Sequence, residues 1–126
     1  MTHSILIVDD EPITRDMLRM MLELAGYHVR EAEDGLDALR QIDTAVPDLV
    51  LLDVMMPGLD GFEVCATLRR MPKTAELPVI MVSAKSAQES IQRGLAAGAN
   101  KYLTKPITRQ FLLDEIKELI GQSSPA

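Results

Sequence analysis

The sequence predicts an α/β fold, a doubly wound (βα)5 domain whose parallel five-stranded sheet carries helices on both faces. Short apolar runs alternate five times with segments of helical spacing, the first of these runs is rich in β-branched residues, and acids, glycines or prolines bound the runs. Strand–helix alternation of this kind builds a parallel sheet through right-handed crossovers. A chain of 126 residues is long enough for one such domain with a single core.

The first strand–helix unit begins with residues 5–8 (ILIV), a β-branched run followed by acids. Pro12 suits the first turn of a helix, because its missing amide hydrogen would have no partner there. The helix is predicted to end at Gly26. Its predicted buried face consists of apolar residues at helical spacing: Ile13, Met17, Met20, Met21 and Leu24.

The second and third units place an acid at the end of a buried strand. A strand at 27–32 precedes a helix that Asp34 caps. Residues 49–52 (LVLL) are apolar at each position, so this strand is predicted to be covered on both faces, and the next residue is Asp53. The apolar positions of the two helices in these units are Leu36, Leu39 and Ile42, then Phe62, Cys65 and Leu68.

The last two units place a serine and a lysine after their strands. A fourth strand at 78–82 precedes Ser83 and a helix that carries Ile91 and Leu95 and ends near Gly98, and a fifth strand at 101–104 (KYLT) precedes Lys105. The final helix has five apolar positions: Phe111, Leu112, Ile116, Leu119 and Ile120.

Composition excludes several classes of function. A net charge of -6 and a pI of about 4.8 argue against direct nucleic-acid binding, which depends on neutralising phosphates. No apolar run approaches the length of a membrane span, and no secretory signal is present. The single cysteine, Cys65, excludes an intrachain disulfide and fits a reducing compartment. We therefore expect a cytoplasmic protein.

Polar residues follow four of the predicted strands: Asp9 and Asp10, Asp53, Ser83, and Lys105. Because the carboxyl ends of parallel strands share one edge of the sheet, and ligands of open α/β sheets bind outside that edge, these side chains are expected to converge. Carboxylates this close repel one another, so at least one should resist ionising unless a hard cation is bound.

Magnesium is the cation that such a site would take, since it prefers oxygen ligands and one or two carboxylates. Asp10 and Asp53 are predicted to bind it directly, Asp9 through water, and Met55 through its backbone carbonyl. With a hydroxyl and a lysine, the set is typical of phosphoryl transfer, in which an aspartate can be the nucleophile. Asp53 is the candidate nucleophile.

Lys105 would then pair with a phosphoryl oxygen, and Ser83 would donate a hydrogen bond to another after its loop moves. Each residue also has a purely structural interpretation. The first two acids could cap a helix, Asp53 could be a loop acid, and Lys105 a solvated charge. Tyr102 could be a core residue with an exposed hydroxyl. The combination of these residues at four strand ends favours the functional interpretation.

Four segments resemble the receiver domain of two-component response regulators: ILIVDDE, PDLVLLDVMMPGLDGFE, PVIMVSA and KYLTKP. The resemblance extends from residue 5 to about residue 120. It implies a flavodoxin-like fold with strand order 2-1-3-4-5. It assigns residues 1–121 to a receiver domain and leaves 122–126 as a flexible tail or the start of a linker.

The resemblance also implies roles for individual residues. Asp53 would accept a phosphoryl group from a sensor histidine kinase or a histidine phosphotransfer protein, in a reaction that depends on Mg²⁺, for which Mn²⁺ could substitute. Asp9 and Asp10 match the metal-binding acid pair. Three residues match the switch and the phosphoryl-binding lysine of the family: Ser83, Tyr102 and Lys105.

Further implications concern regulation and partners. Met55 and Lys85 occupy positions that tune the lifetime of the phosphorylated state in this family. Phosphorylation would reshape the face made by the fourth helix, fifth strand and fifth helix, controlling an effector protein or a fused output domain. The chain would act as a monomer or a phosphorylation-dependent dimer and catalyse only its own phosphorylation and dephosphorylation. The first helix (ITRDMLRM) is where the family meets its kinase.

Two other classes of function compete with this one. A magnesium-dependent phosphohydrolase with an aspartyl-phosphate intermediate would need a second acid two residues after Asp53, where Met55 stands, and a cap for which the chain has no room. A scaffold that works without phosphorylation would not need the complete set of site residues.

Overall fold

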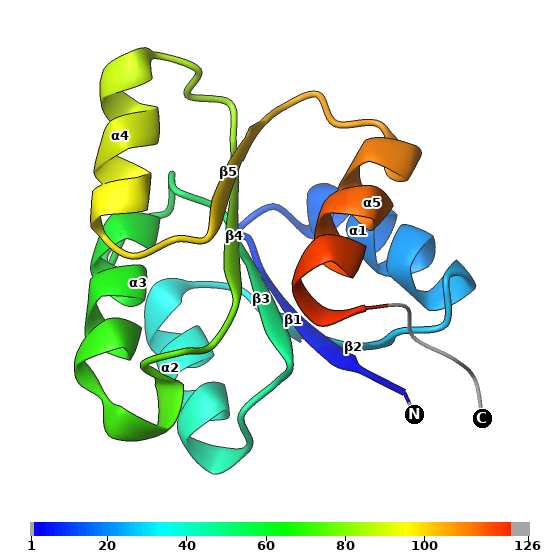
Figure 1. The fold of residues 1–126 in the computed structure, drawn as a ribbon, viewed down its shortest axis with the longest axis horizontal. Helices are drawn as coiled ribbons and strands as arrows, with labels where there is room; N and C mark the ends of the chain where they lie inside the picture. Colours follow the sequence, from blue (N-terminus) through cyan, green and yellow to red (C-terminus); the bar gives the residue numbers. More distant parts are fainter. Residues whose placement is uncertain (1, 122–126) are drawn as a thin grey trace.

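The structure is a computed structural model that describes residues 2–121, so the tail predicted at 122–126 lies outside the described residues. Within them the chain forms a parallel sheet with the strand order β2-β1-β3-β4-β5 (Figure 1). The elements are β1 (Ser4–Val8), α1 (Pro12–Leu24), β2 (His28–Ala32), α2 (Gly35–Thr44), β3 (Leu49–Leu52), α3 (Gly61–Arg70), a 3-10 turn (Pro72–Thr74), β4 (Val79–Ser83), α4 (Gln88–Ala96), β5 (Lys101–Thr104) and α5 (Arg109–Ile120).

The predicted fold class is confirmed, including the strand order and the placement of helices on both faces. Helices α1 and α5 cover one face of the sheet, and α2, α3 and α4 cover the other (Figure 1). Strand β2 begins one residue later than expected, and β4 is shifted by one residue and ends at Ser83. Asp34 caps α2 as predicted, because its side chain accepts a hydrogen bond from the Asp37 amide.

The prediction for the buried face of α1 is wrong. Leu18 and Leu22 are the buried residues of this helix, and Met21 is only partly buried. The residues that lie outside are Ile13, Met17, Met20 and Leu24, which are 54–78% exposed and which we call the α1 stripe. Both sets have helical spacing, so periodicity could not decide which one faces the sheet.

Three other residues that were placed on apolar helix faces are also exposed: Leu36, Leu95 and Phe111. Each helix covers the sheet with a narrow strip, and that strip is already occupied by other residues. Helix α2 buries Ala38 and Ile42, and α5 buries Leu112, Leu113 and Ile116. The three predicted positions of α3 are buried as expected: Phe62, Cys65 and Leu68.

The core consists of two apolar layers, one on each face of the sheet. Residues of β1 and β3 alternate between them, so that Leu6 and Val50 belong to one layer and Ile7 and Leu51 to the other. Each fully buried Leu or Ile contributes roughly 2 kcal/mol from removal of apolar surface from water. Because successive residues of β3 face opposite layers and both layers are apolar, LVLL is apolar at each position.

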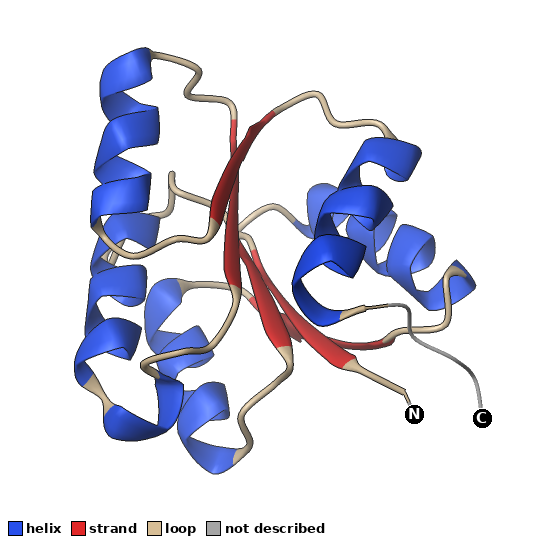
Figure 2. Ribbon diagram, in the orientation of Figure 1, coloured by secondary structure: helices blue, strands red, loops and turns tan. Residues whose placement is uncertain are grey.

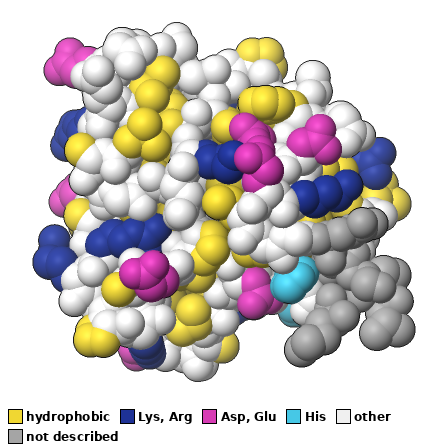
Figure 3. All heavy atoms as spheres, in the orientation of Figure 1, with side chains coloured by type: hydrophobic (Ala, Val, Ile, Leu, Met, Phe, Trp, Pro, Cys, Tyr) yellow, Lys and Arg dark blue, Asp and Glu magenta, His cyan; other side chains and the backbone are white. Residues whose placement is uncertain are grey.

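The surface differs from that core. On the face seen in Figure 3, acidic and basic side chains are interspersed, with apolar side chains between them. No helix formed by residues 2–121 combines the length and apolar character that crossing a membrane requires.

Candidate functional site

The register of the sheet brings the predicted site residues to one edge, where loops leave the strands in the upper half of Figure 2. Val8 of β1 is paired with Leu52 of β3, so the next residues, Asp9 and Asp53, are neighbours. The Asp53 amide donates to the Val8 carbonyl at 2.9 Å. On the other side of β3, the Lys105 amide donates to the Ser83 carbonyl at 2.8 Å, which joins the ends of β4 and β5.

The three aspartates form one cluster. One carboxylate oxygen from each of Asp9, Asp10 and Asp53 lies within 4.8 Å of the others. Asp9 and Asp53 are buried, whereas Asp10 is exposed. Such a set of oxygen donors, partly open to solvent, fits a hard divalent cation, and these three residues would hold it.

Two of the carboxylates are held in place by hydrogen bonds. Asp9 accepts from the Glu11 amide at 2.9 Å and, through its other oxygen, pairs with the Lys105 ammonium at 3.3 Å. Asp53 accepts from the Met55 amide at 3.2 Å. The alternative interpretation, in which Asp9 and Asp10 cap the first helix, is wrong. Glu11 is the N-cap of α1, and no side chain of the described residues caps that helix.

Burial raises the pKa of Asp53 from 3.8 to about 6. Loss of hydration is the largest cause, the positive charge of Lys105 opposes it, and the negative charge of Asp9 adds to it. This confirms the expectation that at least one carboxyl of the cluster resists ionising. A cation bound among the oxygens would favour the ionised form, which is the form that can act as a nucleophile.

The cluster opens into a cavity of about 380 Å³. Its lining consists of Asp10, Glu11, Asp53, Met55, Ala84 and Lys105. Met55 therefore lies at the cavity, and its side chain is half exposed. The role predicted for its backbone carbonyl stays a prediction.

Ser83 is close in sequence to the cavity but is not presented to it. The residue is fully buried, and its hydroxyl accepts a hydrogen bond from the Lys85 amide at 3.1 Å. The Tyr102 hydroxyl donates to the carbonyl of the same Lys85 at 2.8 Å. The main chain of Lys85 thus contacts both residues that were predicted to form the switch.

Two glycines allow close approaches that sequence reasoning missed. A Cβ on Gly61 would lie 2.5 Å from the Asp53 carbonyl oxygen, so the absence of a side chain lets α3 begin directly against the Asp53 main chain. A Cβ on Gly94 would lie 2.7 Å from the Tyr102 ring and 2.8 Å from the Met81 sulfur. A glycine inside a helix lowers the stability of that helix. The presence of glycine at position 94 was therefore the sequence signal that could have indicated a close contact there.

Arg15 is a further residue that sequence reasoning missed. Its guanidinium donates to the Asp9 carbonyl at 2.6 Å and to Glu31 at 3.2 Å. Nothing in the spacing of α1 distinguishes it from Arg19, because both arginines lie on the same side of the helix.

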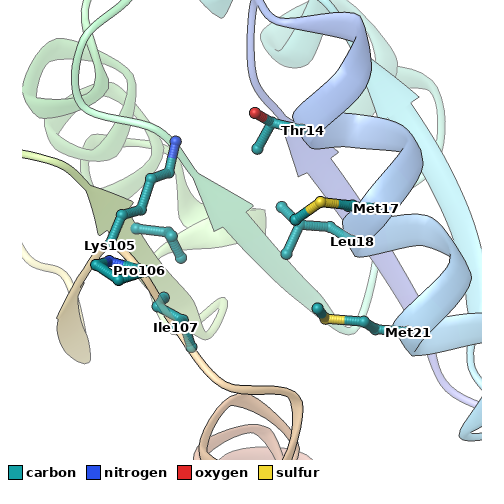
Figure 4. A pocket seen from close by; sticks show the side chains of 8 residues that line it. Thr14, Met17, Leu18, Met21, Lys105, Pro106 and Ile107 are labelled. Carbon is teal, nitrogen blue, oxygen red and sulfur yellow. The ribbon is translucent and has the colours of Figure 1, made fainter.

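An apolar cavity of about 260 Å³ lies beside Lys105, between α1 and the segment after β5 (Figure 4). Its lining includes Met17 of the α1 stripe together with Met21 and Ile107. In Figure 4 the Lys105 side chain extends away from these apolar groups at one end of the cavity. The site is therefore bordered by apolar surface that residues 2–121 leave uncovered.

Known proteins are similar to this chain in sequence and in fold. A family model described as the response regulator receiver domain matches residues 5–117. The chain is 40% identical over 119 residues to the DNA-binding dual master transcriptional regulator RpaA of Synechocystis sp., in an alignment that covers 94% of this chain and 49% of that protein. The chain spans about half the length of the curated relatives it matches.

Two solved structures are also similar. The chemotaxis protein CheY4 of Vibrio cholerae is 33% identical, with a TM-score of 0.89 and coverage of 94% of this chain and 99% of that one. The receiver domain of the sensor histidine kinase PA1611 from Pseudomonas aeruginosa is 31% identical, with a TM-score of 0.89 and coverage of 97% and 100%. That domain has a magnesium ion coordinated in its active site cleft.

Proposed function

The chain belongs to the response regulator receiver domain family, and from this premise we propose that Asp53 accepts a phosphoryl group from a phosphohistidine in a Mg²⁺-dependent reaction. The observation that carries the proposal is the surroundings of Asp53. Its buried carboxylate lies in one cluster with Asp9 and Asp10, and Lys105 lines the same cavity. Burying an ionised carboxylate among other acids costs folding free energy, and we take this cost as a sign that the charge of Asp53 serves the function.

The carboxylates fit the metal that this family implies. Asp10 and Asp53 would bind it directly and Asp9 through water, with the Met55 carbonyl as a further ligand, and Mn²⁺ could replace Mg²⁺. When bound, the cation neutralises negative charge on the acids and on the phosphoryl group. The magnesium ion in the PA1611 receiver domain supports this assignment by similarity.

In the transfer step, an Asp53 carboxylate oxygen forms a bond to phosphorus as the phosphorus–nitrogen bond of the phosphohistidine breaks. The leaving imidazole nitrogen keeps the electron pair and takes up a proton. Lys105, now paired with Asp9 at 3.3 Å, would turn to a phosphoryl oxygen. Dephosphorylation is a separate step: a water oxygen bonds to phosphorus as the bond between phosphorus and the Asp53 oxygen breaks, which releases inorganic phosphate and restores the carboxylate. The chain would thus catalyse only its own phosphorylation and dephosphorylation.

The proposed switch lies on the other side of β3. After phosphorylation the Ser83 hydroxyl would leave the Lys85 amide for a phosphoryl oxygen, and Tyr102, bonded to the same Lys85, would follow. Of the described residues of α4, only Gly94 is buried, so this helix can shift with little loss of burial. Met55 and Lys85 flank the acceptor and the switch, and we propose that they set the phosphorylated-state lifetime.

The α1 stripe and the apolar cavity beside Lys105 support a partner assignment. A histidine kinase or phosphotransfer protein must bring its histidine to Asp53, and apolar surface next to the site is where such a partner can bind. For output, relatives of about twice this length include a DNA-binding regulator. We propose that the face of α4, β5 and α5 controls an effector protein or a fused output domain. The chain would act there as a monomer or as a phosphorylation-dependent dimer.

The first prediction tests the acceptor. Incubation with acetyl phosphate and Mg²⁺ should add one phosphoryl group, detected by intact-mass spectrometry, and Asp53→Asn should abolish the addition because it lacks the nucleophilic oxygen. Asp48→Asn, which changes an acid at the opposite end of β3, is the matched control and should be labelled normally. Undiminished labelling of Asp53→Asn would refute the assignment, and sustained turnover of an external phosphate ester would favour the phosphohydrolase.

A further inference from the structure

We propose that Arg15 is a positioning residue that holds the main chain between Asp9 and Asp10 and so orients Asp10 for the metal. The inference rests on the proposed function, because it concerns the cation that would serve phosphoryl transfer. It assigns a role to a residue outside the acid cluster, on the helix that follows it.

The contacts of Arg15 bridge two strand ends. One terminal nitrogen of its guanidinium donates to the Asp9 carbonyl oxygen at 2.6 Å, and its Nε donates to the Glu31 carboxylate at 3.2 Å. The side chain is 16% exposed, so both bonds are shielded from water. The planar guanidinium is therefore fixed between the end of β1 and the edge strand β2.

The bond to the Asp9 carbonyl matters because of what holds each acid. The Asp9 carboxylate is tied on both oxygens, to the Glu11 amide and to Lys105. By contrast, Asp10 is exposed, and nothing in the described part of the chain hydrogen-bonds its carboxylate. Its direction therefore depends on the peptide unit that joins it to Asp9, and the oxygen of that peptide unit is the one that Arg15 holds.

Arg19 provides a matched control in the same helix. It pairs with the same Glu31 at 2.7 Å and with Glu23 at 3.7 Å, and it also donates to a β2 carbonyl, that of Val29. Its contacts do not include the acid cluster. The two arginines thus share a partner and a charge, and they differ in whether they reach Asp9.

Charge and orientation can be separated by the choice of variant. Removing a cation near a metal site would strengthen cation binding if charge repulsion dominated. Arg15→Lys keeps the charge, but one ammonium on a flexible stem cannot reproduce the fixed two-acceptor geometry of the guanidinium. A loss of affinity in Arg15→Lys would therefore report orientation alone.

The second prediction measures Mg²⁺ binding by isothermal titration calorimetry in the wild-type chain, Arg15→Lys, Arg15→Gln and Arg19→Gln. Groups that orient metal ligands typically change affinity by 10–100-fold, so both Arg15 variants should bind Mg²⁺ at least about tenfold more weakly. Arg19→Gln should stay within about twofold. Acetyl phosphate labelling of the Arg15 variants should be slow at low Mg²⁺ and recover at saturating Mg²⁺, a split that general destabilisation would not produce.

Each outcome decides a separate point. Unchanged affinity in Arg15→Lys, tighter binding in Arg15→Gln, or an equal loss in Arg19→Gln would overturn the role of Arg15. If Arg15→Gln does not fold, the comparison of Arg15→Lys with Arg19→Gln decides. Absence of Mg²⁺ binding by the wild-type chain would instead contradict the proposed function.

Discussion

Helices α3 and α4 each follow a strand that has a site residue at its end or directly after it, yet the two helices are packed very differently against the rest of the molecule. Asp60 and Glu63 form a reciprocal capping box at the start of α3, which also buries Phe62, Val64, Cys65 and Leu68. At α4 the N-cap is Ala87, no side chain of the described residues caps the helix, and Gly94 is its buried residue. A cap is worth about 1 kcal/mol, and four buried side chains are worth several more.

The difference separates two tasks within one site. In the proposed function Asp53 would have to hold its place to react, and it precedes the firmly packed helix. Ser83 would have to move to reach a phosphoryl group, and it precedes the loosely packed helix. The residues between Ser83 and α4, 84–87, are exposed. We infer that the phosphoacceptor half of the site is built to be rigid and the switch half to be displaced at low cost.

The third prediction should have the largest effect on stability and tests the rigid half. Gly61→Ala places a Cβ 2.5 Å from the Asp53 carbonyl oxygen, and main chain cannot move aside as a flexible side chain can. Overpacking of this kind costs about 1–3 kcal/mol, and we expect the upper end together with slower acetyl phosphate labelling. Urea denaturation and labelling rates measure the two effects. A stable, normally labelled variant would show that the β3–α3 connection is not rigid.

The fourth prediction concerns the cost of the Asp53 charge in the metal-free chain. The folded pKa of about 6 exceeds the value of 3.8 taken for the unfolded chain, so proton binding by the folded state stabilises it fully below about pH 4. This stabilisation is lost as pH rises through 6.

Asp53→Asn removes that pH dependence. Relative to this variant, the free energy of unfolding of the metal-free wild type should fall by up to about 3 kcal/mol between pH 4 and pH 7. Binding of Mg²⁺ should restore part of this stability. Thermal unfolding at a series of pH values, with and without Mg²⁺, measures the difference. Parallel stability curves for the two proteins would contradict the role of burial at Asp53.

The fifth prediction has the smallest effect on stability and tests the movable half. Gly94→Ala gains about 1 kcal/mol of helix propensity but brings a Cβ to 2.7 Å from the Tyr102 ring. Because α4 is loosely held, it should shift, and the net change in stability should stay within about 1 kcal/mol. The surroundings of the Tyr102 ring should change. Tyrosine fluorescence in a Tyr27→Phe background can measure this change, because the chain has two tyrosines and no tryptophan.

The contrast between Gly61→Ala and Gly94→Ala is the sharpest test of the two halves. Both substitutions add one methyl group at a close approach. If Gly94→Ala costs as much stability as Gly61→Ala, then α4 is as firmly held as α3, and the switch must work by another route.

Several features could be predicted from the sequence because they depend on neighbours along the chain. Continuous apolar runs such as LVLL indicated strands covered on both faces, and the order of the runs implied a parallel sheet. The rules of parallel connection then brought Asp9, Asp53 and Lys105 to one edge.

Other features depended on contacts between segments far apart in the chain. Periodicity could not tell that Leu18 rather than Met17 faces the sheet, because both satisfy helical spacing and only packing against α5 and the strands selects one. The approach of Gly94 to Tyr102 and the reach of Arg15 to Asp9 and Glu31 follow from positions in space.

The sequence by itself thus determined the fold class, the edge of the sheet that carries the site and the kinds of side chain that gather there. Only the tertiary structure decided which apolar surface stays exposed, which acid is buried and which helix is loosely held. The physical reason is that patterns along the chain record local geometry, whereas burial, desolvation and the room to move are set by the groups that tertiary packing brings together.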